Sequence, residues 1–254
     1  MLTVQGLTKS FGGVHALNQV AFQVPSGSIT ALIGPNGAGK TTCLNVVSGV
    51  YRAGSGKVSF RNQPITHQPS FRLAKLGMTR TFQNLQVFRH MTVLENVMVG
   101  LHAQSSAQFL RSMFRTGGVR REEKTIRQKA LNMLEFFGLA SKADLESTTL
   151  AYGDQKRVEM ARALVSDPKL LLLDEPVAGL NTRETAVMGE MILRIQGQGI
   201  TILLVEHDMD LVMGVSDQVV VLNHGEKIAE GAPTTVQRDP RVIDAYLGFE
   251  DHRA

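Results

Sequence analysis

Gly34-Pro35-Asn36-Gly37-Ala38-Gly39-Lys40-Thr41 is the stretch of this sequence that decides the fold. It lies between a short apolar run, Ile29 to Ile33, and a segment of helical character, roughly Lys40 to Val47. Such a glycine-rich loop lets backbone N–H groups surround phosphate oxygens, and the positive end of the following helix points at them. Lys40 then reaches the β and γ phosphates, and the Thr41 hydroxyl can bind Mg²⁺. The residues expected to contact the nucleotide here are Gly34, Pro35, Asn36, Gly37, Ala38, Gly39, Lys40, Thr41 and Thr42.

A second stretch ends in two acids. Leu170 to Leu173 is an apolar run typical of a buried strand, and Asp174 and Glu175 follow it directly. A carboxylate at the carboxyl end of a central strand lies beside the phosphate loop in open α/β sheets. We therefore expect Asp174 to hold Mg²⁺, through a water molecule, and Glu175 to orient and deprotonate an attacking water.

The order of strand and helix signals predicts an α/β protein. Residues 2–33 read as strands, and the last third alternates strand and helix, with strands at Leu170 to Leu173, Thr201 to Val205 and Val219 to Leu222. This alternation indicates a mostly parallel sheet with helices on both faces. Residues from Thr92 to Phe137 read as helices instead, interrupted by a polar, basic stretch from Ala103 to Arg121 that we expect to be an exposed loop.

Composition excludes several classes of protein. The chain has 254 residues, a formal charge of +4 and one cysteine, Cys43, which cannot form an internal disulfide and is expected to be a small buried hydrophobe. The positive excess is small and mostly dispersed, so we expect no nucleic-acid partner. Because no apolar run approaches the ~20 residues of a membrane helix, we expect an intracellular chain whose role at a membrane needs a partner.

One segment of eight residues points to a particular protein family. Leu150-Ala151-Tyr152-Gly153-Asp154-Gln155-Lys156-Arg157 resembles the signature segment of ABC ATPases, whose usual form is Leu-Ser-Gly-Gly-Gln, and it precedes the acidic strand as it does there. Gly153 and the start of the next helix offer N–H donors to a γ-phosphate. In the family that phosphate belongs to ATP held by the other subunit of a dimer. Two departures from the usual pattern matter: Ala151 replaces a serine that binds γ-phosphate, and Asn181 replaces an aspartate of the dimer-contact loop.

Other residues take their expected roles from this resemblance alone. Gln83 matches the glutamine that touches Mg²⁺ and senses the membrane partner, and His207 matches the histidine that contacts γ-phosphate. Phe11 matches the aromatic that stacks on adenine, although its position alone would suggest the core. Residues 178–181 match the dimer-contact loop. The resemblance thus implies Glu175, His207 and Gln83 as catalytic residues, Phe11, Ala151 and Gly153 as further ATP contacts, and Thr41, Gln83 and Asp174 around Mg²⁺.

The implied fold is the ABC type of P-loop NTPase: a RecA-like core with an antiparallel β subdomain and an inserted helical subdomain. We expect a single ABC ATPase domain over 1–254, with the ATP-binding core at approximately 1–90 and 165–254. The helical signature subdomain is expected at approximately 91–164.

The implied function is hydrolysis of ATP to power an ABC importer. The sequence most resembles the larger ATPase subunit of branched-chain amino-acid importers. Three features carry this resemblance: the form of the signature, the basic insert before it and the C-terminal segment Ala245-Tyr246-Leu247-Gly248. Partners implied are integral membrane permease subunits, a second ATPase subunit (a paralogue or a second copy) and, indirectly, a periplasmic or surface substrate-binding protein. The location implied is peripheral, on the cytoplasmic side of the membrane. The alternatives are a related system for urea or amide import or lipopolysaccharide export, or a non-transport ABC ATPase.

Overall fold

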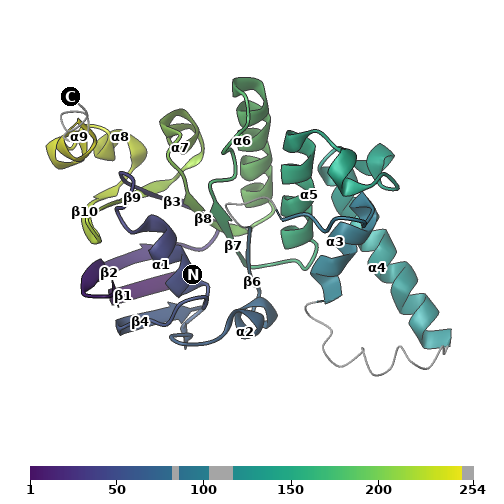
Figure 1. The fold of residues 1–254 in the computed structure, drawn as a ribbon, viewed down its shortest axis with the longest axis horizontal. Coiled ribbons are helices and arrows are strands. Elements are labelled where there is room, and N and C mark those ends of the chain that lie inside the picture. The colour runs from purple at the N-terminus through teal and green to yellow at the C-terminus, as the bar shows by residue number, and fades with distance from the viewer. Residues whose placement is uncertain (82–85, 103–116, 248–254) are drawn as a thin grey trace.

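Two β-sheets form the frame of the molecule (Figure 1). The computed structural model describes residues 1–81, 86–102 and 117–247. A four-stranded antiparallel sheet has the order β2-β1-β4-β5, and a six-stranded sheet has the order β10-β9-β3-β8-β7-β6. The strands of the first are β1 (Leu2–Phe11), β2 (Val14–Val24), β4 (Ser55–Phe60) and β5 (Gln63–Pro64); those of the second are β3 (Ile29–Ile33), β6 (Met78–Arg80), β7 (Leu170–Asp174), β8 (Thr201–Val205), β9 (Gln218–Asn223) and β10 (Glu226–Gly231).

The six-stranded sheet is parallel except for one outer strand. β3 pairs in parallel with β8 and β9, and β7 pairs in parallel with β6 and β8, whereas β10 is antiparallel to β9. In register, Leu32 of β3 lies beside Val205 of β8, and Val205 lies beside Asp174 of β7. The predicted mostly parallel sheet is confirmed. Because of this register, β3, β7 and β8 end at the same level. The loops that follow them therefore begin side by side at the carboxyl ends of the parallel strands, a border of the sheet that we call the sheet edge.

Helices cover both faces of that sheet, and alternate residues of β7 show how. Leu170 and Leu172 belong to the cluster formed with α1 (Lys40–Val47) and the antiparallel sheet. Leu171 and Leu173 face the opposite way, toward the cluster that includes α6 (Thr182–Gly197). The remaining helices on this part of the chain are α2 (Ser70–Lys75), α7 (Met209–Val215), α8 (Pro233–Val236) and α9 (Pro240–Leu247).

Three helices, α3 (Val93–His102), α4 (Gly117–Phe136) and α5 (Tyr152–Leu164), gather at one end of the molecule (Figure 1). Two short 3₁₀ turns, η1 (Ala140–Lys142) and η2 (Ser147–Thr149), connect α4 to α5. The predicted helical character of this region is confirmed. The predicted loop is wrong for its last residues, because α4 already begins at Gly117 and runs on through charged residues that are good helix formers. Residues 103–116 lie outside the described part of the chain.

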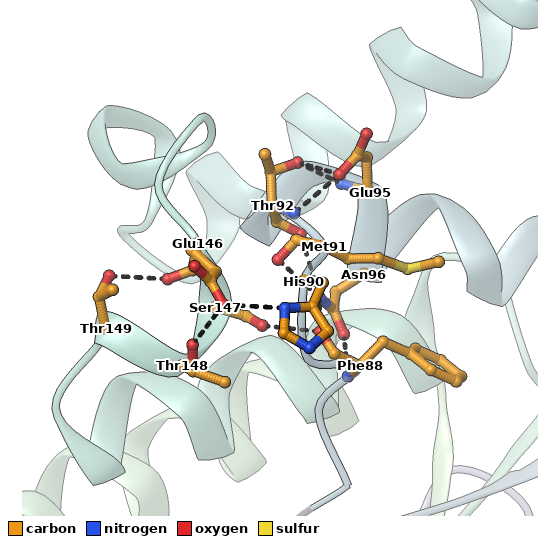
Figure 2. Close-up of polar contacts among 10 residues, drawn as sticks. All are labelled: Phe88, His90, Met91, Thr92, Glu95, Asn96, Glu146, Ser147, Thr148 and Thr149. Carbon is orange, nitrogen blue, oxygen red and sulfur yellow. Dashed lines mark hydrogen bonds and ion pairs between the residues drawn. The ribbon is translucent and has the colours of Figure 1, made fainter.

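Buried polar side chains fix the entry to these helices (Figure 2). The Asn96 amide accepts a hydrogen bond from the Phe88 N–H (2.8 Å) and donates to the carbonyls of Phe88 and Thr92 (3.2 and 3.1 Å). The Ser147 hydroxyl donates to the same Phe88 carbonyl at 3.0 Å. Asn96 and Ser147 are fully buried. The loop that ends at α3 is therefore tied to the turn that precedes α5, three residues before Leu150.

Two simpler expectations can be checked directly. Cys43 is fully buried on α1, and burial raises the pKa of its thiol to about 12, which confirms a packing residue rather than a reactive thiol. Within the described ranges, no helix has both the length and the apolar character needed to cross a membrane.

Candidate functional site

The phosphate loop occupies the turn between β3 and α1, and two of its glycines are required by close backbone contacts. A Cβ on Gly34 would lie 2.1 Å from the carbonyl oxygen of Leu222, and one on Gly39 would lie 2.4 Å from that of Ala16. Both residues also have positive φ, at 148° and 101°. Because α1 begins at Lys40, the first N–H groups of this helix have no partner within the helix and are available to an anion.

Lys40 crosses this loop. Its ammonium donates to the carbonyls of Gly34 and Pro35 at 2.6 and 2.9 Å, and the residue is only 7% exposed. Burial lowers the pKa of Lys40, while the carboxylates of Glu175 and Asp174 raise it. The lysine, the phosphate loop and the two acids are thus brought together, as the sequence predicts.

Asp174 ends β7 as a buried carboxylate with one oxygen available. Its Oδ2 accepts a hydrogen bond from Arg80 at 2.8 Å, whereas its Oδ1 is buried and, within the part of the chain that the structure describes, has no hydrogen-bond partner. Burial raises the pKa of Asp174, and the hydrogen bond and charge of Arg80 oppose that rise. A buried anionic oxygen without a donor fits a cation or its coordinated water.

Glu175 follows in a backbone conformation that few side chains adopt. Its φ is 48°, in the left-handed region, and its N–H donates to the Val205 carbonyl at 2.9 Å. Such a conformation persists only where the surrounding structure holds it, and it is concentrated at functional sites. The bond to β8 fixes the turn by which Glu175 leaves the sheet.

The loop after β8 carries His207 and a residue that the sequence analysis missed. Glu206 is completely buried, and its carboxylate accepts from the N–H groups of Val177, His207 and Asp208. His207 itself is exposed, with its Nδ1 3.6 Å from the Glu206 carboxylate. Glu206 could have been found by analogy, because it follows an apolar strand as Asp174 does.

The signature segment forms the N-terminus of α5. Ala151 is the N-cap residue, is exposed and makes no side-chain cap hydrogen bond. Asp154 is buried, and its carboxylate binds Lys142 and Arg157. The charge of Asp154 is therefore neutralised by two cations of its own chain.

Residues 178–181, which the sequence analysis matched to a dimer-contact loop, lie against this segment. A Cβ on Gly179 would lie 3.0 Å from the Tyr152 ring, so the two segments pack closely. Asn181 is the N-cap of α6: its side chain accepts from the Glu184 N–H at 3.0 Å, and the Glu184 carboxylate accepts from the Asn181 N–H at 3.1 Å. The departure from the usual aspartate thus preserves a helix cap.

Phe11 lies at the end of β1 and is 44% exposed, so it is not a core residue. Its ring meets that of Tyr51 edge-on at 5.4 Å between centroids, and the Lys9 ammonium lies 4.8 Å from the Phe11 ring. Tyr51, which follows α1, carries no signal in the sequence that would have singled it out. Gln83, expected at the metal and as a catalytic residue, lies outside the described residues.

Comparison with known proteins agrees with this geometry. A family model described as "ABC transporter" matches residues 17–178, and one described as "Branched-chain amino acid ATP-binding cassette transporter" matches residues 226–251. The chain is 42% identical to the high-affinity branched-chain amino acid transport ATP-binding protein LivG of Salmonella typhimurium, over 98% of both chains. It is 41% identical to the protein BraF of Pseudomonas aeruginosa, again over 98% of both chains.

Solved structures give the same answer for the fold. The chain resembles the ADP conformation of an ATP-binding cassette of an ABC transporter with a TM-score of 0.86 and 36% identity, over 98% of both chains. A nucleotide-free ATP-binding cassette from an ABC transporter gives a TM-score of 0.85 at 36% identity, over 97% of this chain and 98% of that one.

Replacing Lys40 by alanine should weaken nucleotide binding. A hydrogen bond to a charged group is worth about 1.5–3 kcal/mol, which corresponds to a Kd roughly 10- to 100-fold higher. Calorimetric titration with ATP measures this, with Lys57→Ala on the exposed part of β4 as the control. If the Kd of Lys40→Ala stayed within twofold of the control, the ammonium would not face the phosphates.

Proposed function

The chain belongs to the ABC transporter family of ATP-binding proteins, and from this we propose that it hydrolyses ATP to drive import of branched-chain amino acids. The observation that carries the hydrolytic part is the shared sheet edge, at which β3 leads into the phosphate loop and β7 ends at Asp174 beside β8. The cargo rests on the relatives, whose names specify branched-chain amino acid transport. Among the residues that the structure describes, we assign none to binding of the amino acid itself.

ATP is the substrate proposed to bind at this sheet edge. In the proposed complex the N–H groups of residues 37–42 surround the β and γ phosphates, and Lys40 exchanges its bonds to the Gly34 and Pro35 carbonyls for phosphate oxygens. Phe11, exposed beside Tyr51, offers its ring to adenine. Exposed aromatic faces of this kind stack on bases.

Mg²⁺ is the cation proposed for the orphan oxygen of Asp174. The Thr41 hydroxyl and Asp174 Oδ1 would hold it, and it would neutralise charge on the β and γ phosphates. Arg80 keeps the other carboxylate oxygen in place. Gln83 is proposed as a further ligand, on the resemblance alone.

Glu175 is proposed to orient and deprotonate the attacking water, and His207 to contact the γ-phosphate. Glu175 starts from β7 and His207 follows β8, so both loops leave the sheet where the phosphate loop does. Held in this way, the carboxylate and the imidazole approach the terminal phosphate from the same edge.

The γ-phosphate site is proposed to be completed by a second ATPase subunit. In one chain, α1 and α5 lie well apart on either side of β7 (Figure 1), so the signature segment cannot cover the nucleotide bound at its own phosphate loop. The start of α5, where Ala151 is exposed and Gly153 is buried, instead offers its N–H groups to ATP on another subunit. That subunit is a paralogue or a second copy.

A groove between the sheet and the helices is the proposed docking site for the permease. A cavity of about 340 Å³ is lined by α2, β6, α3 and α5, with Phe88 and Arg162 on its wall. Phe88 is exposed and its ring lies 5.1 Å from the Arg162 guanidinium carbon, whereas Val87 packs against the core. Docking by such a subunit would hold the chain at the cytoplasmic face of the membrane, with the substrate-binding protein acting through the permease.

Glu175→Gln should bind ATP normally and hydrolyse it very slowly. The amide keeps the shape of the side chain and loses the base, which corresponds to a fall in kcat of ~10²–10⁴. Glu190→Gln, at an exposed position of α6, is the matched control. A phosphate-release assay that gave control-like turnover for Glu175→Gln would remove this carboxylate from the mechanism.

A cysteine at position 88 should cross-link to the membrane subunit. The one native thiol, Cys43, is buried with a raised pKa, so it should not compete for the reagent. Phe88→Cys is compared with Val14→Cys, which is exposed on the antiparallel sheet. Cross-links from position 14 but none from position 88, in membranes that contain the co-expressed permease, would place docking elsewhere.

Ala151→Ser should be tolerated and should modestly tighten the ATP-bound dimer. The site is exposed and lacks a side-chain cap, so there is room for a hydroxyl that can bind the opposite γ-phosphate or cap α5, the latter worth about 1 kcal/mol. ATP-dependent dimerisation of Glu175→Gln with and without this change measures the effect, with Ala186→Ser on α6 as the control. A clearly weaker dimer from a well-folded double variant would contradict a phosphate-facing Ala151.

A further inference from the structure

Glu206 is an unusual acidic residue, because its carboxylate contacts neither solvent nor, within the described ranges, a lysine or arginine. It follows β8 and has no exposed surface. Burying a charge is costly unless hydrogen bonds satisfy it. Here the compensation comes from backbone: Oε1 accepts from the Val177 N–H at 3.2 Å, and Oε2 accepts from the N–H groups of His207 and Asp208 at 2.8 and 3.2 Å.

These three donors belong to two different loops. Val177 lies two residues after Glu175 and continues into the dimer-contact loop through the bond from the Leu180 N–H to its carbonyl (3.0 Å). His207 and Asp208 belong to the loop after β8, where Asp208 caps α7 by accepting from the Leu211 N–H at 2.9 Å. One side chain thus joins the segment that carries Glu175 to the segment that carries His207.

The same carboxylate lies beside the His207 imidazole. Nδ1 is 3.6 Å from Oε2 while the side chain remains 59% exposed. This separation is longer than a hydrogen bond, so the carboxylate lies next to the ring without a direct bond to it. Glu206 therefore holds the backbone of His207 directly, and the His207 ring lies next to the same carboxylate.

We propose that Glu206 is the positioning residue of the hydrolytic site: its buried carboxylate fixes the spacing between the loop of Glu175 and the loop of His207. The proposal rests on the proposed ATPase function. In this proposal Glu206 does not contact the substrate, and it affects turnover through Glu175 and His207. Lys40 and the phosphate loop receive no bond from it, and their affinity for nucleotide is expected to be independent of it.

Glu206→Gln is the test because it preserves volume and removes acceptor capacity. The amide oxygen can serve one loop, but the NH₂ group is a donor that then faces the N–H of the other loop. The two loops should separate or rotate. A displacement of about 1 Å in such a site can lower turnover roughly 100-fold.

Steady-state ATPase assays, calorimetric ATP binding and thermal melting are measured together on wild type, Glu206→Gln and the control Glu190→Gln. The expected result is a fall in kcat of roughly 10- to 100-fold for Glu206→Gln, with KM and the Kd for ATP within about twofold of wild type. Glu206→Asp, which keeps two acceptor oxygens, should recover part of the lost kcat, and it serves as the test if Glu206→Gln does not fold.

The outcomes separate the two proposals. Folded Glu206→Gln with kcat within twofold of wild type overturns the positioning role, as does a loss of kcat matched by an equal loss of ATP affinity and of folded protein. A folded Glu206→Asp that is no more active than Glu206→Gln also overturns it. If wild type itself bound and hydrolysed no ATP, the proposed function would fail instead, and Glu175→Gln serves to tell these cases apart.

Discussion

The register of three parallel strands is the constraint on which the rest of the structure depends. Leu32 lies beside Val205, and Val205 lies beside Asp174, so β3, β8 and β7 reach the sheet edge together. The segments that leave this edge carry the phosphate loop, the two acids and the buried Glu206. A slip of one residue would turn every side chain of a strand to the other face and would separate these groups. Because every residue of β3, β7 and β8 is buried, such a slip would be costly.

Contiguous patterns in the sequence predicted much of this arrangement. The phosphate loop, the strand ending at Asp174 and the alternation after it are each read from neighbouring residues, and the structure confirms their elements. Partners distant in sequence could not be predicted: Arg80 meets Asp174 across 94 positions, and Asp154 turns to Lys142 and Arg157 rather than toward a phosphate. The start of α4 was missed because glycine and basic residues resemble a loop when packing is unknown. Phe11 is exposed because of its hairpin, which its residue type does not reveal.

The proposed chemistry is divided between two places in the chain. The phosphate loop and its acids stand at the sheet edge, whereas the signature segment begins α5 among the helices at the other end (Figure 1). Asn96 and Ser147 tie the loop at Phe88, on the groove wall, to the turn just before that signature segment (Figure 2). Movement of a partner in the groove would therefore reach the start of α5 through hydrogen bonds rather than through a flexible linker. This gives the proposed coupling between transport and hydrolysis a physical route.

The dependence of specific ATPase activity on protein concentration tests the central claim, a site shared between subunits, most directly. The purified chain is diluted through the range in which light scattering shows pairs giving way to single subunits, with Lys40→Ala subtracted as background. If each ATP needs the signature segment of a second subunit, activity per molecule should fall as the pairs dissociate. Constant activity per molecule in solutions that contain only single subunits would contradict it.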